Sequence, residues 1–280
     1  MPEAARLSDA TAHGGVISAP GCSDVLIHYL LAARVGDQHV CPLSDGNKPH
    51  LGGPIVRGVR DVKIGGQFAS RVSDTALCKG PVDVIVGGAA DVLIKGSVLN
   101  FHASKGGGNT LVAVDPETKT IYIESFVEYS GPGATQAYAD AAKKIIEDTW
   151  RGTCQRDGEP DNVEVNVHTA VNQRGQPTPG YDPIIVDPAT TRANQTLFGD
   201  GPGHQSPSDL RSDQRIPAHE YGHSLGLNDE YHDPPGGGPS VPNDPSKKAN
   251  IMAQTWADPD GTMPHPHQDQ YDKILKNYGW

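Results

Sequence analysis

The sequence predicts two different domains, an N-terminal all-β domain of three short repeats and a C-terminal α+β domain. The first 98 residues contain an internal repeat whose units are short strands bounded by glycine, whereas residues 110–280 alternate strand and helix patterns. Charge divides the chain at the same place: residues 1–98 carry nine basic and nine acidic side chains, while the whole chain has a net charge of −11. The intervening residues 99–109 include a glycine-rich stretch and are predicted to be a linker.

Each N-terminal repeat opens with an arginine three residues before an aspartate and continues to a short strand rich in β-branched residues. The openings are EAARLSD (3–9), LAARVGD (31–37) and FASRVSD (68–74), and the strands are residues 23–27, 60–64 and 90–94. One such unit is too small to bury a core alone. We therefore expect the three units to pack as arms about a common axis.

Potential metal ligands stand at comparable places in the repeats. His13, His50 and Cys78 supply one ligand per repeat, and the second repeat adds His39 and Cys41. Three histidines with one cysteine, or two of each, suit a tetrahedral Zn²⁺ of the closed, structural type. The spacing favours Cys41 as the fourth ligand, because His13, Cys41 and Cys78 each follow the aspartate of their repeat by four residues.

The segments AHGG, HVCP, PHLGGPI and LCKGP, together with three DV-x-I strands, resemble the PAAR-repeat domain over residues 1–98. The resemblance implies a β cone whose apex holds a structural zinc ion and whose base docks on the trimeric valine-glycine-repeat spike of type VI secretion. It implies His13, His50 and Cys78 as zinc ligands. The usual set of that family, three histidines and one cysteine, points to His39 as the fourth ligand, so His39 and Cys41 both stay open.

The C-terminal elements follow from turn residues, helix-forming composition and apolar alternation. In chain order they are a hairpin (111–115 and 120–125), a helix ended by Gly152 (134–151), a half-buried strand (163–167), a helix capped by Ser212 or Asp213, and a terminal helix (268–277).

The helix after residue 213 contains the sequence HEYGHSLGLNDEY, residues 219–231. His219 and His223 are four residues apart, so on a helix they lie on one face and can bind one Zn²⁺. Glu220 then points into the same cleft. A histidine pair at this spacing is typical of zinc binding. The complete HExxHxxGxxD pattern is expected by chance only about 0.0002 times in a chain of this composition.

A third ligand is expected just after the helix. Gly226 stands where a helix that turns sharply would end in a left-handed conformation, and Asp229 follows three residues later. The register of the turn favours Asp229 as the third ligand, with Glu230 as the alternative.

This pattern resembles the metzincin clan of zinc peptidases, in the snapalysin-type variant with aspartate as third ligand. The resemblance implies a catalytic zinc held by His219, His223 and Asp229, with Glu220 as general base for an activated water. The later segment NIMA is similar to the Met-turn of the clan, which would place Met252 beneath the metal.

Together these features predict a type VI secretion spike-tip effector whose C-terminal domain hydrolyses peptide bonds with a zinc-activated water. Two zinc ions are expected, one catalytic and one structural at the apex. The alternative is a structural spike tip whose C-terminal extension is a degenerate peptidase that acts as an adaptor or binding module. The expected partners are the valine-glycine-repeat spike protein, a cognate immunity protein, and a protein or peptide substrate.

Composition excludes two other classes of protein. The acidic balance and the absence of Lys/Arg clusters exclude a nucleic-acid binder. No run approaches the roughly 18 apolar residues that a membrane span needs, so stable membrane insertion is not expected.

The first 15 residues lack the basic and apolar regions of a signal peptide. We therefore expect a protein made in the cytoplasm and secreted without a signal peptide, through type VI secretion, into target cells.

Overall fold

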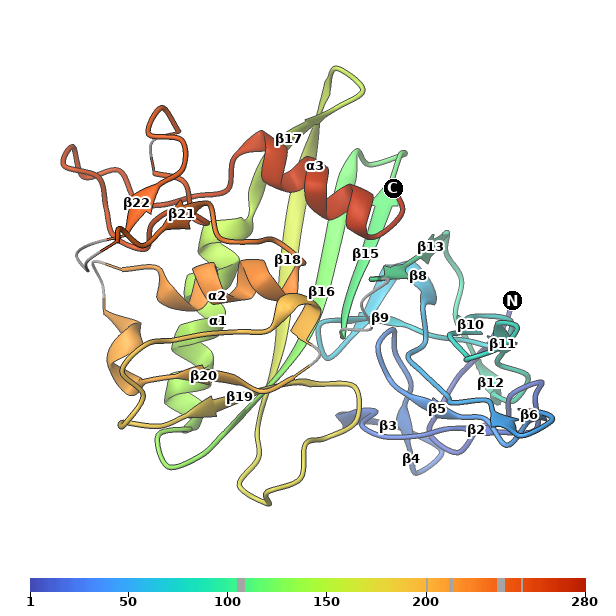
Figure 1. Cartoon of the computed structure of the whole chain (residues 1–280). Coiled ribbons are helices and arrows are strands. Elements are labelled where there is room, and N and C mark those ends of the chain that lie inside the picture. The colour runs from blue at the N-terminus through green and yellow to red at the C-terminus, as the bar shows by residue number, and fades with distance from the viewer. Residues whose placement is uncertain (105–108, 200, 212–213, 236–239, 248) are drawn as a thin grey trace. The chain divides into compact units, whose positions relative to one another are not determined.

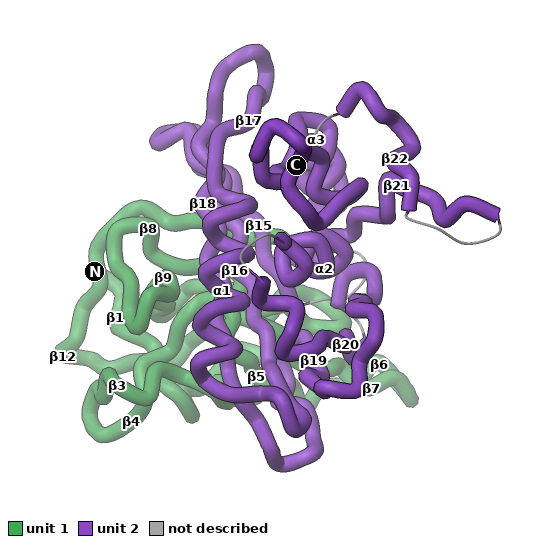
Figure 2. Tube along the Cα trace, turned by 90° about the vertical axis from the view of Figure 1, so that its left-hand side faces the viewer, with its two compact units in different colours: residues 1–102 green, residues 103–280 purple. Residues whose placement is uncertain are grey.

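The computed structural model describes residues 1–104, 109–199, 201–211, 214–235, 240–247 and 249–280. The chain forms two compact units, residues 1–102 and 103–280 (Figure 2). The division falls within the predicted linker 99–109, of which residues 105–108 lie outside the described part. Within the described residues, no helix has the length and apolar character needed to cross a membrane.

The first unit consists of short strands joined by turns (Figure 1). Its strands pair β1 with β12, β2 with β5, β3 with β4, β6 with β7, β10 with β11, and β8 with both β9 and β13. The three strands expected from the repeat correspond to β3, β8 and β12. The bounds are β1 (Glu3–Ala4), β2 (Val16–Ile17), β3 (Cys22–Ile27), β4 (Leu30–Ala32), β5 (His39–Val40), β6 (Ser44–Asp45), β7 (Lys48–Pro49), β8 (Arg57–Ile64), β9 (Gln67–Ala69), β10 (Thr75–Ala76), β11 (Asp83–Val84), β12 (Ala89–Leu93) and β13 (Val98–Asn100).

The repeats meet in a closed ring of backbone hydrogen bonds. Ala33 N donates to Ala5 O at 2.9 Å, Ala5 N to Ser70 O at 3.0 Å, and Ser70 N to Ala33 O at 3.1 Å. These three residues hold the same place in the three repeats, directly before the arginine. The small side chains in the repeat allow this close approach. The ring of hydrogen bonds confirms that the three repeats pack about a common axis.

Beside this ring, each repeat contributes one isoleucine to a shared core. Ile17, Ile55 and Ile85 are at most 1% exposed and belong to one apolar cluster. Burial of three such side chains is worth several kcal/mol that no single repeat could obtain alone. The threefold repeat of the sequence is therefore also the repeat of the core.

The turn that opens each repeat is closed by its aspartate. The carboxylate accepts a hydrogen bond from the backbone N–H of the arginine three residues earlier, at 2.7, 2.8 and 2.9 Å for Arg6–Asp9, Arg34–Asp37 and Arg71–Asp74. In the third repeat the guanidinium is turned away: Arg71 Nη1 donates to the Ile94 carbonyl at 3.0 Å, and Arg71 Nε lies 4.0 Å from Asp74. Burial therefore raises the pKa of Asp74 to about 6.

The second unit is built on a mixed sheet that contains the order β15-β16-β18-β17, with β19 beside β16 and β20 beside β19. Strands β16, β18, β19 and β20 pair in parallel, and β15 and β17 pair with their neighbours in antiparallel fashion. The bounds are β15 (Thr110–Asp115), β16 (Thr120–Ser130), β17 (Gly152–Arg156), β18 (Glu159–Val171), β19 (Asp182–Val186) and β20 (Gly203–Gln205), while β14 (His102–Ala103) spans the division between the units.

Helices and short elements complete the second unit. Helix α1 and helix α2 lie on one side of the sheet (Figure 1). The bounds are α1 (Gln136–Trp150), η1 (Leu197–Gly199), η2 (Pro207–Leu210), α2 (Ile216–Ser224), β21 (Tyr231–His232), β22 (Val241–Pro242) and α3 (Gln268–Asn277). Helix α3 has the predicted bounds, and the hairpin and long helix have their predicted places. The long helix ends at Trp150 with Arg151 as its C-cap, and Gly152, predicted to end it, instead opens β17.

The core of the second unit holds α2 against the sheet and α1. Trp150, at the end of α1, is fully buried and its indole Nε1 donates to the Ala218 carbonyl of α2 at 2.8 Å. Tyr221 of α2 is hydrogen-bonded to Ser125 of β16 at 2.7 Å. Helix α2 begins after Arg215, which makes no side-chain capping bond. The caps predicted for it, residues 212 and 213, lie outside the described part.

Candidate metal centres

Helix α2 presents two histidines to the same point. The rings of His219 and His223 lie one turn apart with centroids 5.1 Å from each other. His219 Nδ1 lies 2.7 Å from the Ile251 carbonyl oxygen, and His223 Nδ1 lies 2.7 Å from that of Leu227. A carbonyl oxygen can only accept, so each Nδ1 carries the hydrogen and, in the neutral ring, each Nε2 offers a lone pair.

The two lone pairs converge on a carboxylate. Asp229 Oδ1 lies 3.1 Å from His219 Nε2 and 3.4 Å from His223 Nε2. With neutral rings, three acceptor atoms face one another without a hydrogen between them, an arrangement that a bound metal ion would stabilise. When a ring is protonated, its Nε2–H and its charge lower the pKa of Asp229 well below the usual range, although burial alone would raise it. Two imidazole nitrogens and one carboxylate oxygen, all within 4.8 Å of one another, fit the three-ligand set of a catalytic zinc site.

The turn at Gly226 brings Asp229 back to the helix. Gly226 has φ of +81°, and a β-carbon there would lie 2.2 Å from Cε1 of Phe198. Gly226 N donates to the His223 carbonyl at 2.8 Å, and Leu227 N to the Gly222 carbonyl at 3.0 Å. These bonds close the last turn of α2 and reverse the chain.

Met252 packs directly against α2 at Gly222. Its side chain is fully buried, and a β-carbon at Gly222 would lie 2.2 Å from its sulfur. Met252 N donates to Asn250 Oδ1 at 2.9 Å, which folds residues 250–253 into a tight turn. The carbonyl that fixes His219 comes from Ile251 in this same turn. The turn therefore supports the helix and orients one histidine.

Glu230 makes different contacts from Asp229. Its carboxylate accepts hydrogen bonds from Asn250 Nδ2 at 2.7 Å and from Lys273 Nζ at 2.8 Å. Although burial acts to raise it, these bonds lower the pKa of Glu230. Of the two alternatives for a third ligand, only Asp229 faces the histidine pair.

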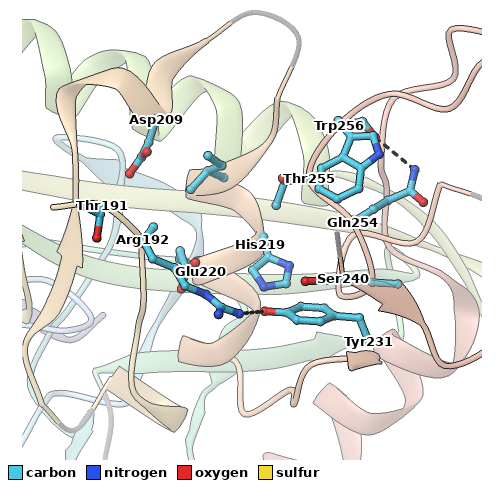
Figure 3. Close-up of a pocket in the computed structure, with 13 residues that line it drawn as sticks. Thr191, Arg192, Asp209, His219, Glu220, Tyr231, Ser240, Gln254, Thr255 and Trp256 are labelled. Carbon is cyan, nitrogen blue, oxygen red and sulfur yellow. Dashed lines mark hydrogen bonds between the residues drawn. The ribbon is translucent and has the colours of Figure 1, made fainter. Parts of the chain in front are cut away.

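Glu220 lies in a cleft beside the histidines (Figure 3). The side chains of Thr191, Arg192, Asp209, Tyr231 and Trp256 line this cleft together with His219 and Glu220. Glu220 is only 6% exposed, and its Oε2 has no hydrogen-bond partner within the described part of the chain. Burial raises the pKa of Glu220 above its ordinary value. A buried carboxylate with one uncommitted oxygen is suited to accept a proton.

A second group of ligands lies in the first unit. The potential ligand atoms of His13, Cys41, His50 and Cys78 all lie within 4.8 Å of one another. Cys41 Sγ is 3.5 Å from His13 Nδ1 and 3.9 Å from His50 Nδ1. Burial and then the neighbouring Cys41 raise the pKa of the Cys78 thiol to about 11. Two imidazoles and two thiols fit a closed tetrahedral zinc site.

The expectation that His39 is the fourth member of this group is wrong, because Cys41 and not His39 lies beside the other three ligands. His39 N donates to the Gly53 carbonyl at 2.9 Å, and the His39 ring lies 2.9 Å from that carbonyl through Nδ1 and 3.4 Å from Asp83 through Nε2. Pairing of His39 with Ile17 between β5 and β2 fixes it inside the repeat, where it is 2% exposed. The chain reaches the ligand group only two residues later, at Cys41, the residue that the spacing favours.

Two side chains of the C-terminal cleft carried no recognised signal in the sequence. Tyr231 lies two residues after Asp229, inside the segment already singled out, and Arg192 comes from a loop far earlier in the chain. The proximity of Tyr231 to the motif was the available signal. Nothing local in the sequence marks Arg192, because tertiary folding alone brings it to the cleft.

Comparison with known families identifies the N-terminal part of the chain. Residues 7–47 and 45–105 match the PAAR motif. Comparison of the whole chain with curated proteins gives no match. These matches support a PAAR domain in the N-terminal part, and the PAAR motif suggests a place at the tip of a type VI secretion spike. Such a domain implies association with the valine-glycine-repeat spike and zinc binding, to which the His13, Cys41, His50 and Cys78 group corresponds.

Proposed function

We propose that the chain is a type VI secretion spike-tip effector whose second unit is a zinc-dependent endopeptidase. The observation that carries the proposal is the convergence of His219 Nε2, His223 Nε2 and Asp229 Oδ1, with both imidazoles locked by backbone carbonyls. A buried glutamate in the adjoining cleft supports it. A PAAR domain gives the route of delivery, and a peptidase gives a reason for the delivery.

Each of the named residues of the second unit would have a separate part in peptide hydrolysis. His219, His223 and Asp229 would hold a zinc ion, which when bound polarises a peptide carbonyl and makes water more acidic. Glu220 takes one proton from the attacking water while the oxygen of that water bonds to the carbonyl carbon. Glu220 then gives that proton to the leaving nitrogen when the carbon–nitrogen bond breaks. Ile251 and Leu227 keep both histidines in the ligating tautomer throughout.

The expected partners follow from this role. A protein or peptide is the substrate, and the producing cell needs an immunity protein that blocks the cleft. The PAAR domain supplies the second zinc site, held by His13, Cys41, His50 and Cys78. An adaptor without activity remains the alternative function, and the variants below separate it from a peptidase.

The test is protein digestion by the purified full chain loaded with zinc, with casein as the probe. Glu220→Gln keeps the shape of the side chain but removes the base, so we expect a rate lower by about 10²–10⁴ with zinc content unchanged. Glu164→Gln, on an exposed position of β18, is the matched control and should digest casein as the wild type does. Chelation should abolish digestion, and zinc should restore it. Wild-type protein that binds zinc but leaves casein and other unfolded proteins intact would favour the adaptor.

A further inference from the structure

The cleft beside His219 contains a tyrosine and an arginine that face each other (Figure 3). Arg192 Nη2 donates to the Tyr231 hydroxyl at 2.9 Å, and the Tyr231 ring lies 6.0 Å from the His219 ring. Both side chains line the cleft that contains Glu220. What these two residues do for a substrate rests on the proposed peptidase function.

The direction of this hydrogen bond is fixed by chemistry. A guanidinium carries only N–H donors, so the phenol oxygen of Tyr231 must accept from Arg192. The phenol hydrogen is then free for another acceptor, and none is found for it in the part of the chain that the structure describes. Tyr231 therefore offers a donor to the cleft.

The arginine is itself held in place. Arg192 Nη1 lies 3.3 Å from Asp233, whose other oxygen accepts from Ser240 Oγ at 2.6 Å. The result is a chain from Ser240 through Asp233 and Arg192 to Tyr231, which orients the phenol from behind. A cation on the oxygen of a phenol also strengthens the phenol as a donor, because hydrogen bonds in a chain polarise one another.

We propose that Tyr231 donates a hydrogen bond to the carbonyl oxygen of the scissile peptide and stabilises the negative charge that develops there. Arg192 is a positioning residue that acts through Tyr231. No proton leaves the phenol in this step. The water oxygen bonds to the carbonyl carbon, the carbonyl π electrons move to oxygen, and Glu220 receives the proton of the water. The donor is useful because it is in place before the charge appears.

The first test compares Tyr231→Phe with Tyr29→Phe. Loss of one donor of this type costs about 10²–10³ in kcat, so Tyr231→Phe should lose activity by that factor, with zinc content unchanged and KM changed little. A phosphinic peptide, which mimics the charged tetrahedral state, should bind this variant more weakly by a similar factor in calorimetry. Tyr29 is 95% exposed in the first unit, and its loss should change none of these values.

The second test asks whether Arg192 acts through Tyr231. Arg192→Met should lower kcat about three- to tenfold, the worth of one hydrogen bond, when Tyr231 is present. In the Tyr231→Phe background the same change should have almost no effect. Losses that multiply in the double variant would overturn the positioning role and indicate that Arg192 contacts the substrate itself.

The outcomes distinguish this inference from the function on which it rests. Wild-type digestion together with unchanged kcat and phosphinate binding in Tyr231→Phe would overturn the inference and leave the peptidase intact. Loss of zinc in Tyr231→Phe would also overturn it, because Tyr231 would then be holding the metal site. Wild-type protein inactive on every unfolded substrate and unable to bind the phosphinate would overturn both.

Discussion

The turn that ends α2 allows the geometry of the C-terminal centre to be tested without touching a ligand. Gly226→Ala forces a residue with a β-carbon into φ of +81°, and the new atom would lie 2.2 Å from Cε1 of Phe198 and 2.8 Å from Nδ2 of Asn277. The left-handed conformation alone costs about 1 kcal/mol. Relief of the contact with Phe198 requires a movement of about 1 Å, and overpacking of this kind costs about 1–3 kcal/mol.

Gly158 provides a matched control in the same unit. Gly158 has φ of +82°, and a β-carbon there would have no neighbour within 4 Å. Gly158→Ala therefore measures the conformational cost alone, about 1 kcal/mol, whereas Gly226→Ala should lower the free energy of unfolding by about 2–4 kcal/mol. The assay is denaturant unfolding of both variants beside the wild type.

Metal affinity supplies the second readout. Asp229 follows Gly226 by three residues, so a shift of the turn should move its carboxylate relative to the two histidines. We expect Gly226→Ala to weaken zinc binding at least tenfold in competition with a chelator, and Gly158→Ala to leave it unchanged. Equal unfolding free energies for the two variants, or unaltered zinc affinity in Gly226→Ala, would refute the view that this turn places the third ligand.

Three further results are expected. Elemental analysis should find about two zinc ions per chain; Cys41→Ala should lose one, His223→Ala should lose the other, and His39→Phe should keep both. Burial raises the pKa of Asp74 from 3.8 to about 6, so the folded chain binds this proton more tightly than the unfolded chain does. The contribution of this proton to the free energy of unfolding should therefore fall by about 3 kcal/mol as pH rises from about 4 to 6. Unfolding of wild type and Asp74→Asn at both pH values should show this dependence in the wild type and not in the variant. Residues 1–102 should bind the valine-glycine-repeat spike in a pull-down, and binding by residues 103–280 instead would reverse the roles of the two units.

Features that depend on local spacing were predictable from sequence. The arginine–aspartate turn closes over three residues, so its three copies reveal the repeat. His219 and His223 share a face because a helix repeats every 3.6 residues. The place of Gly226 follows equally from the chemistry of a single residue, since only glycine enters the left-handed region at little cost. In each case the contacts that fix the feature lie within one turn of chain.

Choices between neighbouring residues were decided by contacts from distant parts of the chain. Asp229 and Glu230 are chemically equivalent ligands, but Lys273 and Asn250 bind Glu230, and only Asp229 is left for the histidines. His39 was expected at the apex from the usual ligands of the PAAR-repeat domain, yet Gly53 and Asp83 hold it inside the repeat.

The sequence alone therefore determined the repeat, the histidine pair with its glutamate, and the types of side chain gathered at each centre. The tertiary structure decided which of two adjacent candidates faces each centre, and it brought Arg192 to Tyr231 from a separate loop. The physical reason is the range of the interactions. A spacing pattern fixes bonds within a turn or a strand pair, whereas a side chain is excluded from or admitted to a site by partners that only the folded chain brings near.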